Sequence, residues 1–299
     1  MPGLLSSLKR IFLGGGREGF ELDDLATRLE MTPRQFQVIE PRYRSFEIPK
    51  RSGGRRTILA PDDTLKEIQR RILHRVLHGL RVHPAVHGFE QGRSIVTNAR
   101  PHVSKAVVIS LDIRDFFPST SQEQVERYLR VIGWSKAAVQ ELARLTCYQG
   151  ALPQGAPTSP RLSNLVNFRM DARLAGMASS FGGDYTRYAD DITISLAEDV
   201  HEKVFTVTRL AARIIRECGY EVNEEKTQVR RRHQRQEVTG LVVNERIHLP
   251  RETRRWLRAI EHRLRTSGQS SLSEEELSGW LALTAMVHRQ GQRAGVPRA

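Results

Sequence analysis

The chain alternates between apolar runs typical of strands and apolar residues at helical spacing. Residues 106–111 are almost continuously apolar and end at Asp112, as in a strand that is covered on both faces. Two further strand-like runs flank the pair Asp190-Asp191, which predicts a β-hairpin with both carboxylates at its tip. Apolar residues at i, i+3 and i+4 over 65–80 predict a core helix.

The N-terminal third is predicted to hold short elements. Two short helices are expected over 22–29 and 33–39, and Thr32 before Pro33 is a good cap for the second. A helix-turn-helix reader of DNA is an alternative, which the shortness of both segments disfavours. Residues 46–59 predict two strands joined by a basic Gly-Gly turn. Further helices are expected over 162–170, over 204–218, through the arginine-rich stretch after 249, and from Ser273 onward.

Composition favours a polyanionic partner. The chain has 299 residues with 47 Lys and Arg against 34 Asp and Glu, a net charge of +13 and a pI of about 10.4. An anionic membrane surface is the alternative, but the apolar positions of 1–13 are too few and too interrupted to span a bilayer or form a signal peptide. Cys147 and Cys218 show no paired spacing, so we expect buried thiols in a reducing, cytoplasmic compartment and no zinc site.

Three aspartates are candidates for a metal site. Asp190 and Asp191 alone are more simply an acidic solvated turn. Asp112 changes that interpretation, because a carboxylate that ends a buried strand needs a partner or a metal ion. Together the three carboxylates suit two divalent ions in a phosphoryl-transfer site. A strand-end cap is the alternative role for Asp112, and Asp115 is expected to cap the following turn rather than bind metal.

The order of these motifs resembles that of reverse transcriptases. Asp112 followed by Phe116-Phe117, then the loop 152–160, then Tyr188-Ala-Asp-Asp191, matches the family from about Tyr43 to about Asn244. Within the family the chain looks most like bacterial retron reverse transcriptases, on two features. These are Asn98-Ala99 followed by His102, and the Val238-Thr239-Gly240 segment. The Tyr-Ala-Asp-Asp box is shared with group II intron and other bacterial enzymes.

The resemblance implies an α+β right-hand polymerase. It implies an antiparallel palm sheet with helices on one face, a fingers region, and a short helical thumb. The expected boundaries are an N-terminal helical extension at 1–42, fingers at 43–105, palm at 106–248 with a fingers segment at about 118–160, and thumb and tail at 249–299.

The resemblance also implies a set of site residues. The catalytic residues are Asp112, Asp190 and Asp191, and the metal-binding set adds Ile113, with two Mg²⁺ ions or Mn²⁺ as cofactor. The nucleotide-binding set is Lys50, Arg56, Phe117, Gln154 and Lys226. Phe117 would lie under the sugar and exclude a 2′-hydroxyl, and Lys226 would be a general acid or fixed charge near the pyrophosphate. A core phenylalanine, a turn glutamine and a surface lysine are the alternatives.

Nucleic-acid contacts are expected from the basic hairpin, the retron-like segments and the C-terminal helix. Residues 226–265 hold 12 Lys and Arg against 4 Glu, and the helix after 250 places its arginines opposite Trp256, Leu257, Ile260 and Leu264. A solvated basic face is the alternative. The full expected set is Arg51, Arg55, Asn98, His102, Val238, Thr239, Gly240, Arg251, Arg254, Arg255, Arg258 and Arg265. For His102 a hydrogen-bonded structural role is the alternative.

The predicted function is RNA-directed DNA synthesis from deoxynucleoside triphosphates. The retron resemblance implies a structured noncoding RNA partner, priming from an RNA 2′-hydroxyl, a branched RNA–DNA product, and a defence role against phage with a separate effector protein. Two alternatives remain: another bacterial reverse transcriptase, of group II intron or untemplated type, and a noncatalytic RNA-binding scaffold. A maturase or endonuclease extension would favour the intron type, and we expect none after the thumb.

Overall fold

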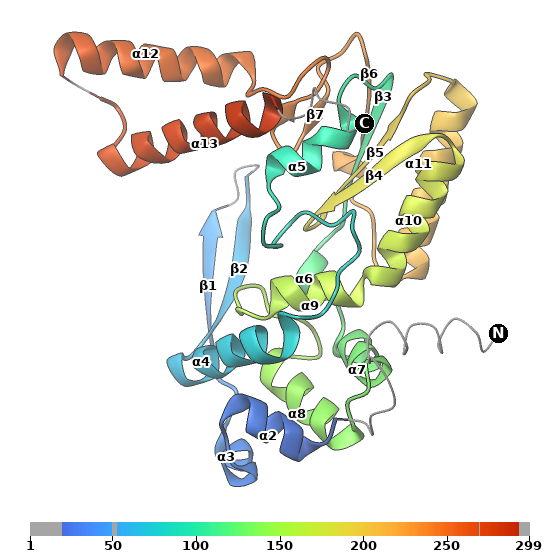
Figure 1. Cartoon of the computed structure of the whole chain (residues 1–299), viewed down its shortest axis with the longest axis vertical. Helices are drawn as coiled ribbons and strands as arrows, with labels where there is room; N and C mark the ends of the chain where they lie inside the picture. Colours follow the sequence, from blue (N-terminus) through green and yellow to red (C-terminus); the bar gives the residue numbers. More distant parts are fainter. Residues whose placement is uncertain (1–19, 50–52, 269, 293–299) are drawn as a thin grey trace. The chain divides into compact units, whose positions relative to one another are not determined.

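The chain passes three times between two compact units. The computed structural model describes residues 20–49, 53–268 and 270–292 (Figure 1). Unit 1 comprises Met1–His83 and Arg114–Met170, and unit 2 comprises Pro84–Ile113 and Asp171–Ala299. The apolar N-terminal stretch 1–13 lies outside the described residues. Residues 84–105, which we expected with the fingers, group with unit 2 because their helix packs on the sheet there.

Unit 1 is helical apart from one hairpin. Its elements are α2 (Leu22–Leu29), α3 (Pro33–Val38), β1 (Tyr43–Pro49), β2 (Arg55–Pro61), α4 (Asp63–Ile72), the π-helix η1 (Leu73–Leu77), α6 (Phe116–Ser119), α7 (Gln122–Val131), α8 (Lys136–Thr146) and α9 (Ser159–Val166). Leucines, valines and isoleucines of α2, α4, α7, α8 and α9 form one buried cluster. The helix expected over 65–80 is observed as α4 followed directly by the π-helix η1, and it ends at Leu77.

Local chemistry explains where the first helices begin. Thr32 caps α3 as predicted, accepting from the Gln35 amide while the Gln35 side chain accepts from the Thr32 amide. At α2 the cap is Glu21, whose backbone N–H donates to the Asp24 side chain. In β1 and β2 the register runs from Tyr43 opposite Pro61 to Pro49 opposite Arg55.

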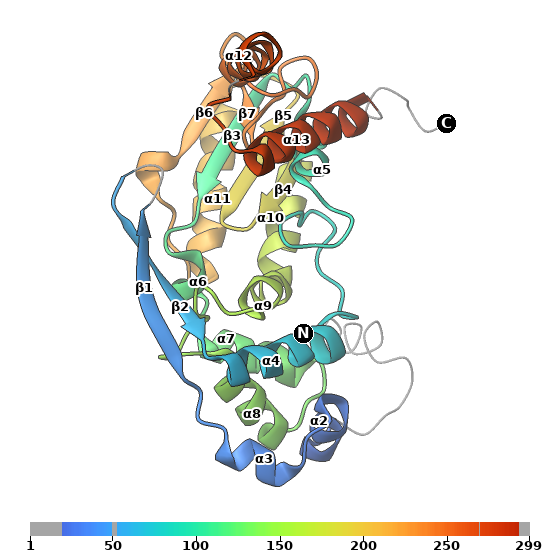
Figure 2. The same ribbon diagram turned by 90° about the vertical axis from the view of Figure 1, so that its left-hand side faces the viewer.

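Unit 2 is built on a four-stranded antiparallel sheet in the order β4-β5-β3-β6. The strands are β3 (Val107–Asp112), β4 (Gly183–Tyr188), β5 (Asp191–Leu196) and β6 (Gln228–Arg231). The long helices α10 (Phe168–Ser180) and α11 (His201–Glu217) lie along one face (Figure 2). These are the helices on one face that the fold class predicts; the short α5 (Ile95–Ala99) and the 3-10 turn η2 (Arg100–His102) pack on the other face.

The C-terminal part of unit 2 has its own small core. It contains η3 (Glu224–Lys226), β7 (Glu237–Val238), β8 (Leu241–Val242), α12 (Arg251–Ser267) and α13 (Glu274–Gln292). Leu257 and Val287 of the two long helices are buried with α5 and the β7–β8 hairpin, and Trp256 and Trp280 pack edge to face. No helix in the described part of the chain is long and apolar enough to cross a membrane.

Candidate active site

The sheet of unit 2 brings the three predicted aspartates to one end. In the β3–β5 register Asp112 lies directly opposite Asp191. The backbone N–H of Ile113 donates to the carbonyl oxygen of Asp190 at 3.1 Å, so the chain after β3 is fixed to the hairpin tip. The N–H of Asn223 donates to the Asp112 carbonyl at 2.8 Å and brings the segment before Lys226 to the same place. Hydrogen bonding of the backbone thus places the carboxylates without help from their side chains.

The hairpin that carries Asp190 and Asp191 turns in two residues. Tyr188 pairs with Asp191, which leaves Ala189 and Asp190 in the turn. Ala189 has φ of 58°, a left-handed conformation that an L-residue adopts only at a cost of about 1–3 kcal/mol unless the surroundings stabilise it.

A buried arginine stabilises this turn. Arg187 Nη1 donates to the carbonyl of Ala189 at 3.0 Å, and its other nitrogens donate to both oxygens of Asp171 at 2.7 and 2.8 Å. Arg187 and Asp171 are both fully buried, and the Tyr185 hydroxyl also donates to Asp171, at 2.6 Å. Burial opposes ionisation of Arg187, but the charge of Asp171 outweighs it and raises the Arg187 pKa above its ordinary value. Arg187 therefore keeps its positive charge beneath the turn.

A backbone segment from the start of unit 2 packs against the same turn. The N–H of Arg187 donates to Ala85 O at 2.9 Å, and the N–H of His87 donates to Arg187 O at 2.8 Å. A Cβ at Gly88 would lie 2.6 Å from the backbone N of Ala189, closer than any real contact. Gly88 is thus required by close approach to the hairpin. Our sequence interpretation missed Arg187, Asp171 and Gly88; a charged residue inside a strand, at Arg187, was the signal available.

The carboxylates repel one another and attract a cation. Burial, followed by the charges of Asp190 and Asp112, raises the pKa of Asp191 to about 6. Lys226 counteracts this: its Nζ lies 3.0 and 3.1 Å from the two Asp112 oxygens, and this hydrogen bond raises the Lys226 pKa. Lys226 is therefore bound to the carboxylate cluster and is not an isolated surface lysine.

The donor set fits divalent cations of the Mg²⁺ type. Carboxylate oxygens are the hard ligands that such ions prefer. The negative charges here are close enough to raise the pKa of Asp191, and a divalent cation would neutralise them. Among the described residues no three Asp, Glu, His or Cys side chains converge into a preformed metal cage. Asp112 points instead to the ammonium of Lys226. The three aspartates thus fit a divalent cation by the type of their ligand atoms and by their common position at one end of the sheet.

The other nucleotide-binding candidates lie in unit 1. Lys50 and Arg51 fall outside the described residues. Arg55 and Arg56 are exposed on β2, and Arg55 pairs with Glu47 at 2.9 Å.

Gln154 and Phe117 are held within unit 1. The carbonyl of Gln154 accepts from the Leu59 N–H at 2.8 Å, and a Cβ at Gly155 would meet the Leu59 carbonyl at 2.8 Å, so this loop lies tightly on β2. Phe117 is half-buried, with its ring 5.5 Å from that of Phe116, and packs against the unit 1 core.

Three residues expected to bind nucleic acid are buried. Asn98 and His102 are fully buried, and Val238 is 1% exposed. The prediction that these three side chains contact RNA directly is therefore wrong. His102 instead connects strands: its Nδ1 lies 2.7 Å from Ser195 Oγ and its Nε2 2.8 Å from Thr186 Oγ1. Desolvation lowers the His102 pKa to about 3, so the ring is neutral.

The Val-Thr-Gly segment is a hairpin turn. Val238 pairs with Leu241, and Thr239 and Gly240 between them have φ of 47° and 77°. Positive φ at both central residues is the pattern of a type I′ turn, which explains the glycine. The Thr239 hydroxyl donates to Ile95 O at 3.2 Å, and Gly240 is exposed.

Helix α12 has the two faces that its sequence predicts. Leu257 and Ile260 are buried, whereas Trp256 and Leu264 are only partly covered, at 39% and 40% exposed. The arginines of the predicted stripe are all exposed: Arg251, Arg254, Arg255, Arg258 and Arg265.

Comparison with known proteins gives one consistent family. Residues 48–249 match the family model described as reverse transcriptase (RNA-dependent DNA polymerase). The chain is 42% identical over 278 residues to the Retron Mx65 reverse transcriptase of Myxococcus xanthus, covering 85% of this chain and 65% of that protein. It is 34% identical over 255 residues to the Retron Ec86 reverse transcriptase of Escherichia coli, covering 84% of this chain and 78% of that protein.

Other relatives are longer, and solved structures agree in fold. The chain matches 57% of the Retron Mx162 reverse transcriptase of Myxococcus xanthus, so it spans less than two thirds of both Myxococcus proteins. Among solved structures, a telomerase from Candida albicans in complex with a telomeric RNA fragment is similar with a TM-score of 0.53 at 14% identity, covering 88% of this chain and 57% of that one. This likeness supports the fold alone, and the expected α+β fold is confirmed.

Proposed function

This chain belongs to the reverse transcriptase family and, within it, to the retron type, and we propose that it is an RNA-directed DNA polymerase. The observation that carries the proposal is the cross-strand placement of Asp112 opposite Asp191, with the Asp190 carbonyl bound to Ile113. This register places several carboxylates at one end of the sheet. Metal ions bound there would neutralise the negative charge of the reacting phosphates.

Asp112, Asp190 and Asp191, with the backbone of Ile113, would hold two Mg²⁺ ions. When bound, the ions supply charge neutralisation of the triphosphate and lower the pKa of the attacking hydroxyl. Lys226, which is bound to Asp112, would supply positive charge near the phosphates of the nucleotide. The chain's own part is to orient the carboxylates through the β3–β5 register and the Arg187-stabilised turn.

We assign nucleotide contacts in unit 1 to Arg56, Phe117 and Gln154, together with Lys50. The support is their match to the family's motifs, the exposure of Arg56, and the fixed Gln154 loop. Phe117 would select the sugar by excluding a 2′-hydroxyl. Asp115 is not assigned: its backbone starts α6 with φ of 45°, its side chain makes no capping hydrogen bond, and it is exposed.

The proposed partner is a structured noncoding RNA. Similarity to retron enzymes supports priming from an RNA 2′-hydroxyl, a branched RNA–DNA product, and a role in defence against phage together with an effector protein. The exposed arginines of α12 and the charge of +13 support binding of a polyanion.

The test of polymerase activity uses two variants and a matched control. Asp112→Asn and Asp190→Asn should each abolish deoxynucleotide incorporation on an RNA template, measured by primer extension, while RNA binding in gel shifts is retained. Asp115→Asn removes the same charge three residues from Asp112 and should extend primers like the wild type. Synthesis by either of the first two variants would refute the metal assignment.

The branched product has its own chemical test. Alkali cleaves RNA through a free 2′-hydroxyl, and a nucleotide whose 2′-oxygen carries DNA has none. DNA isolated from cells that express the chain with its flanking genomic DNA should therefore keep a short RNA remnant after alkali. DNA with a fully removable RNA end would show that priming is not from a 2′-hydroxyl, and would leave the polymerase assignment standing.

A further inference from the structure

The outward face of α11 carries a cationic stripe that the polymerase assignment does not use. Its residues are Phe205, Arg209, Arg213 and Arg216, which fall within about 80° of one another at 100° per residue. All four are exposed. The opposite face is buried in the core of unit 2 through Val204, Val207, Ala211, Ile214 and Ile215. Because that face already anchors the helix, folding does not require the composition of the outer one.

Phe205 is an unusually exposed aromatic residue. Its side chain is 60% exposed, and the guanidinium carbon of Arg209 lies 5.7 Å from the centre of its ring. An aromatic ring held in water beside an arginine is the arrangement that nucleic-acid-binding proteins use for stacking an unpaired base. Arg209 adds a charge for the adjoining phosphate.

The arginines of the stripe keep most of their charge available. In the part of the chain that the structure describes, neither Arg209 nor Arg216 forms an ion pair. Arg213 approaches Glu217 at 3.6 Å, but Glu217 is already bound by Arg173.

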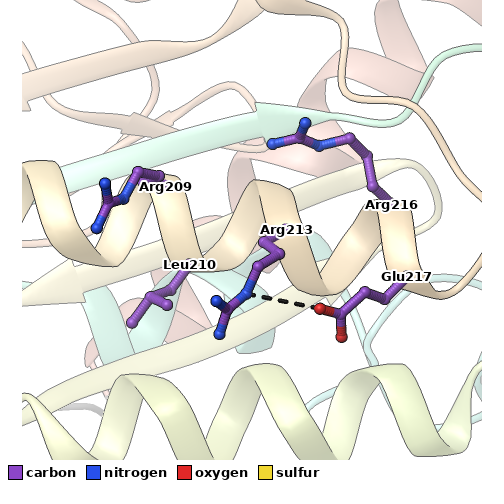
Figure 3. A pocket seen from close by; sticks show the side chains of 5 residues that line it. All are labelled: Arg209, Leu210, Arg213, Arg216 and Glu217. Carbon is purple, nitrogen blue, oxygen red and sulfur yellow. Dashed lines mark ion pairs between the residues drawn. The ribbon is translucent and has the colours of Figure 1, made fainter.

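A shallow hollow joins these side chains. Figure 3 shows these side chains along α11: Arg216 extends above the helix, Arg213 and Glu217 lie below it, and Arg209 lies toward the left. The hollow, of about 480 Å³, is lined by Arg209, Leu210, Arg213, Arg216 and Glu217. Successive arginines are about 4.5–6 Å apart along the helix axis, from the rise of 1.5 Å per residue.

We propose that this stripe binds an unpaired stretch of RNA, with phosphates on the arginines and a base on Phe205. The inference rests on the proposed function, because an enzyme that copies a structured RNA has such a strand at hand. The composition of the stripe favours RNA over a protein partner. The stripe carries three arginines and one exposed ring, whereas a protein-binding surface would present a broad apolar patch. Recognition of unpaired bases by stacking is the mode that suits single-stranded RNA.

The experiment measures binding of a labelled 20-nucleotide oligouridine by fluorescence anisotropy. The full chain is first saturated with an unlabelled RNA–DNA primer-template, so that the remaining binding reports other surfaces. The test variant is Arg209→Gln with Arg216→Gln. The matched control is Arg127→Gln with Arg130→Gln, which removes the same charge from exposed arginines of α7.

Each single-strand phosphate contact contributes about 0.7 to the slope of log K against log salt. Losing two contacts should lower the magnitude of the slope by about 1.4. The loss of affinity between 50 and 200 mM salt should then be about sevenfold smaller in the variant than in the wild type. Phe205→Ala should weaken oligouridine binding and leave the slope unchanged. The control variant should keep the wild-type slope.

Three outcomes overturn the proposal. They are unchanged oligouridine binding in the α11 variants, an equal loss in the control, and a Phe205→Ala variant that binds like the wild type. Primer extension on a short primer-template is measured in parallel and should be unaffected, because these residues are outside the active site. A chain that never extends primers but shows the slope change would refute the proposed function and keep the RNA-binding surface.

Discussion

At the scale of single residues, Arg187 donates a hydrogen bond to the Ala189 carbonyl, in the turn of the hairpin that carries Asp190 and Asp191. Arg187→Met should destabilise the protein by about 3–5 kcal/mol, because Asp171 loses its ion-pair partner in a fully buried site. Replacing the whole network, with Arg187→Met, Asp171→Leu and Tyr185→Phe together, should restore most of that stability. The activity should not return, since the Ala189 carbonyl has then lost the hydrogen bond from Arg187 Nη1.

The two effects are separated by measuring urea unfolding and primer-extension kinetics on the same variants. In the triple variant we expect kcat to fall by about 10²-fold, as for a displacement of about 1 Å in a reacting group, with KM for the nucleotide little changed. A triple variant that regains wild-type kcat along with stability would show that Arg187 is structural only.

His102 gives a prediction about pH. Its folded pKa of about 3 is below the ordinary 6.5, so folding favours the neutral ring. The stabilisation is complete above pH 6.5 and is lost as the pH falls from 6.5 toward 3, at up to about 1.4 kcal/mol per pH unit. His87, with a pKa lowered to about 4 by burial, adds to the same trend.

Urea unfolding of the wild type and of His102→Gln at pH 7, 6 and 5 measures this contribution. The variant should be less stable at pH 7 but should lose less stability on acidification. Parallel pH profiles would show that His102 is not the titrating group.

Phe117 is the residue through which sugar selection is tested. Its ring is half-buried against Phe116, so Phe117→Ala removes bulk at the surface of unit 1. If the ring excludes a 2′-hydroxyl, the ratio of kcat/KM for ribonucleotides to that for deoxynucleotides should rise. A ratio that stays at the wild-type value would make Phe117 a packing residue.

At the scale of elements, the exposed arginines of α12 should contact duplex phosphates. Arg254→Gln with Arg258→Gln should flatten the slope of log K against log salt for an RNA–DNA duplex by one to two units, at about 0.9 per contact. Affinity should fall with little regard to sequence. The Arg127 and Arg130 control serves here too, and an unchanged slope in the α12 variant would identify a solvated face.

Elements whose pattern is local were predicted well from the sequence. The caps of α3, the β1–β2 hairpin and the two faces of α12 depend on neighbours within one or two turns. The sequence allowed a structural role for His102 but could not name its partners, because Ser195 and Thr186 lie on strands about 90 residues away. Likewise the Arg187–Asp171 pair joins residues of different elements, and only the folded sheet shows it.

At the scale of the whole molecule, the net charge of +13 links nucleic-acid binding to stability. A ligand that binds only the folded chain stabilises it by about 4.1 kcal/mol at a concentration of 1,000 Kd. About six phosphate contacts would weaken binding about 10³-fold between 50 and 200 mM salt, which would leave the ligand near its Kd. A fixed concentration of RNA–DNA duplex should therefore raise the unfolding temperature strongly at 50 mM salt and hardly at 200 mM.

Thermal unfolding with and without duplex measures the effect, and polyglutamate of equal charge is the control. Because polyglutamate lacks the spacing of a phosphate backbone, it should stabilise less at both salt concentrations. Equal stabilisation by the two polyanions would show that the excess positive charge acts without any ordered phosphate-binding surface, and the arginines of α12 would then need no specific geometry.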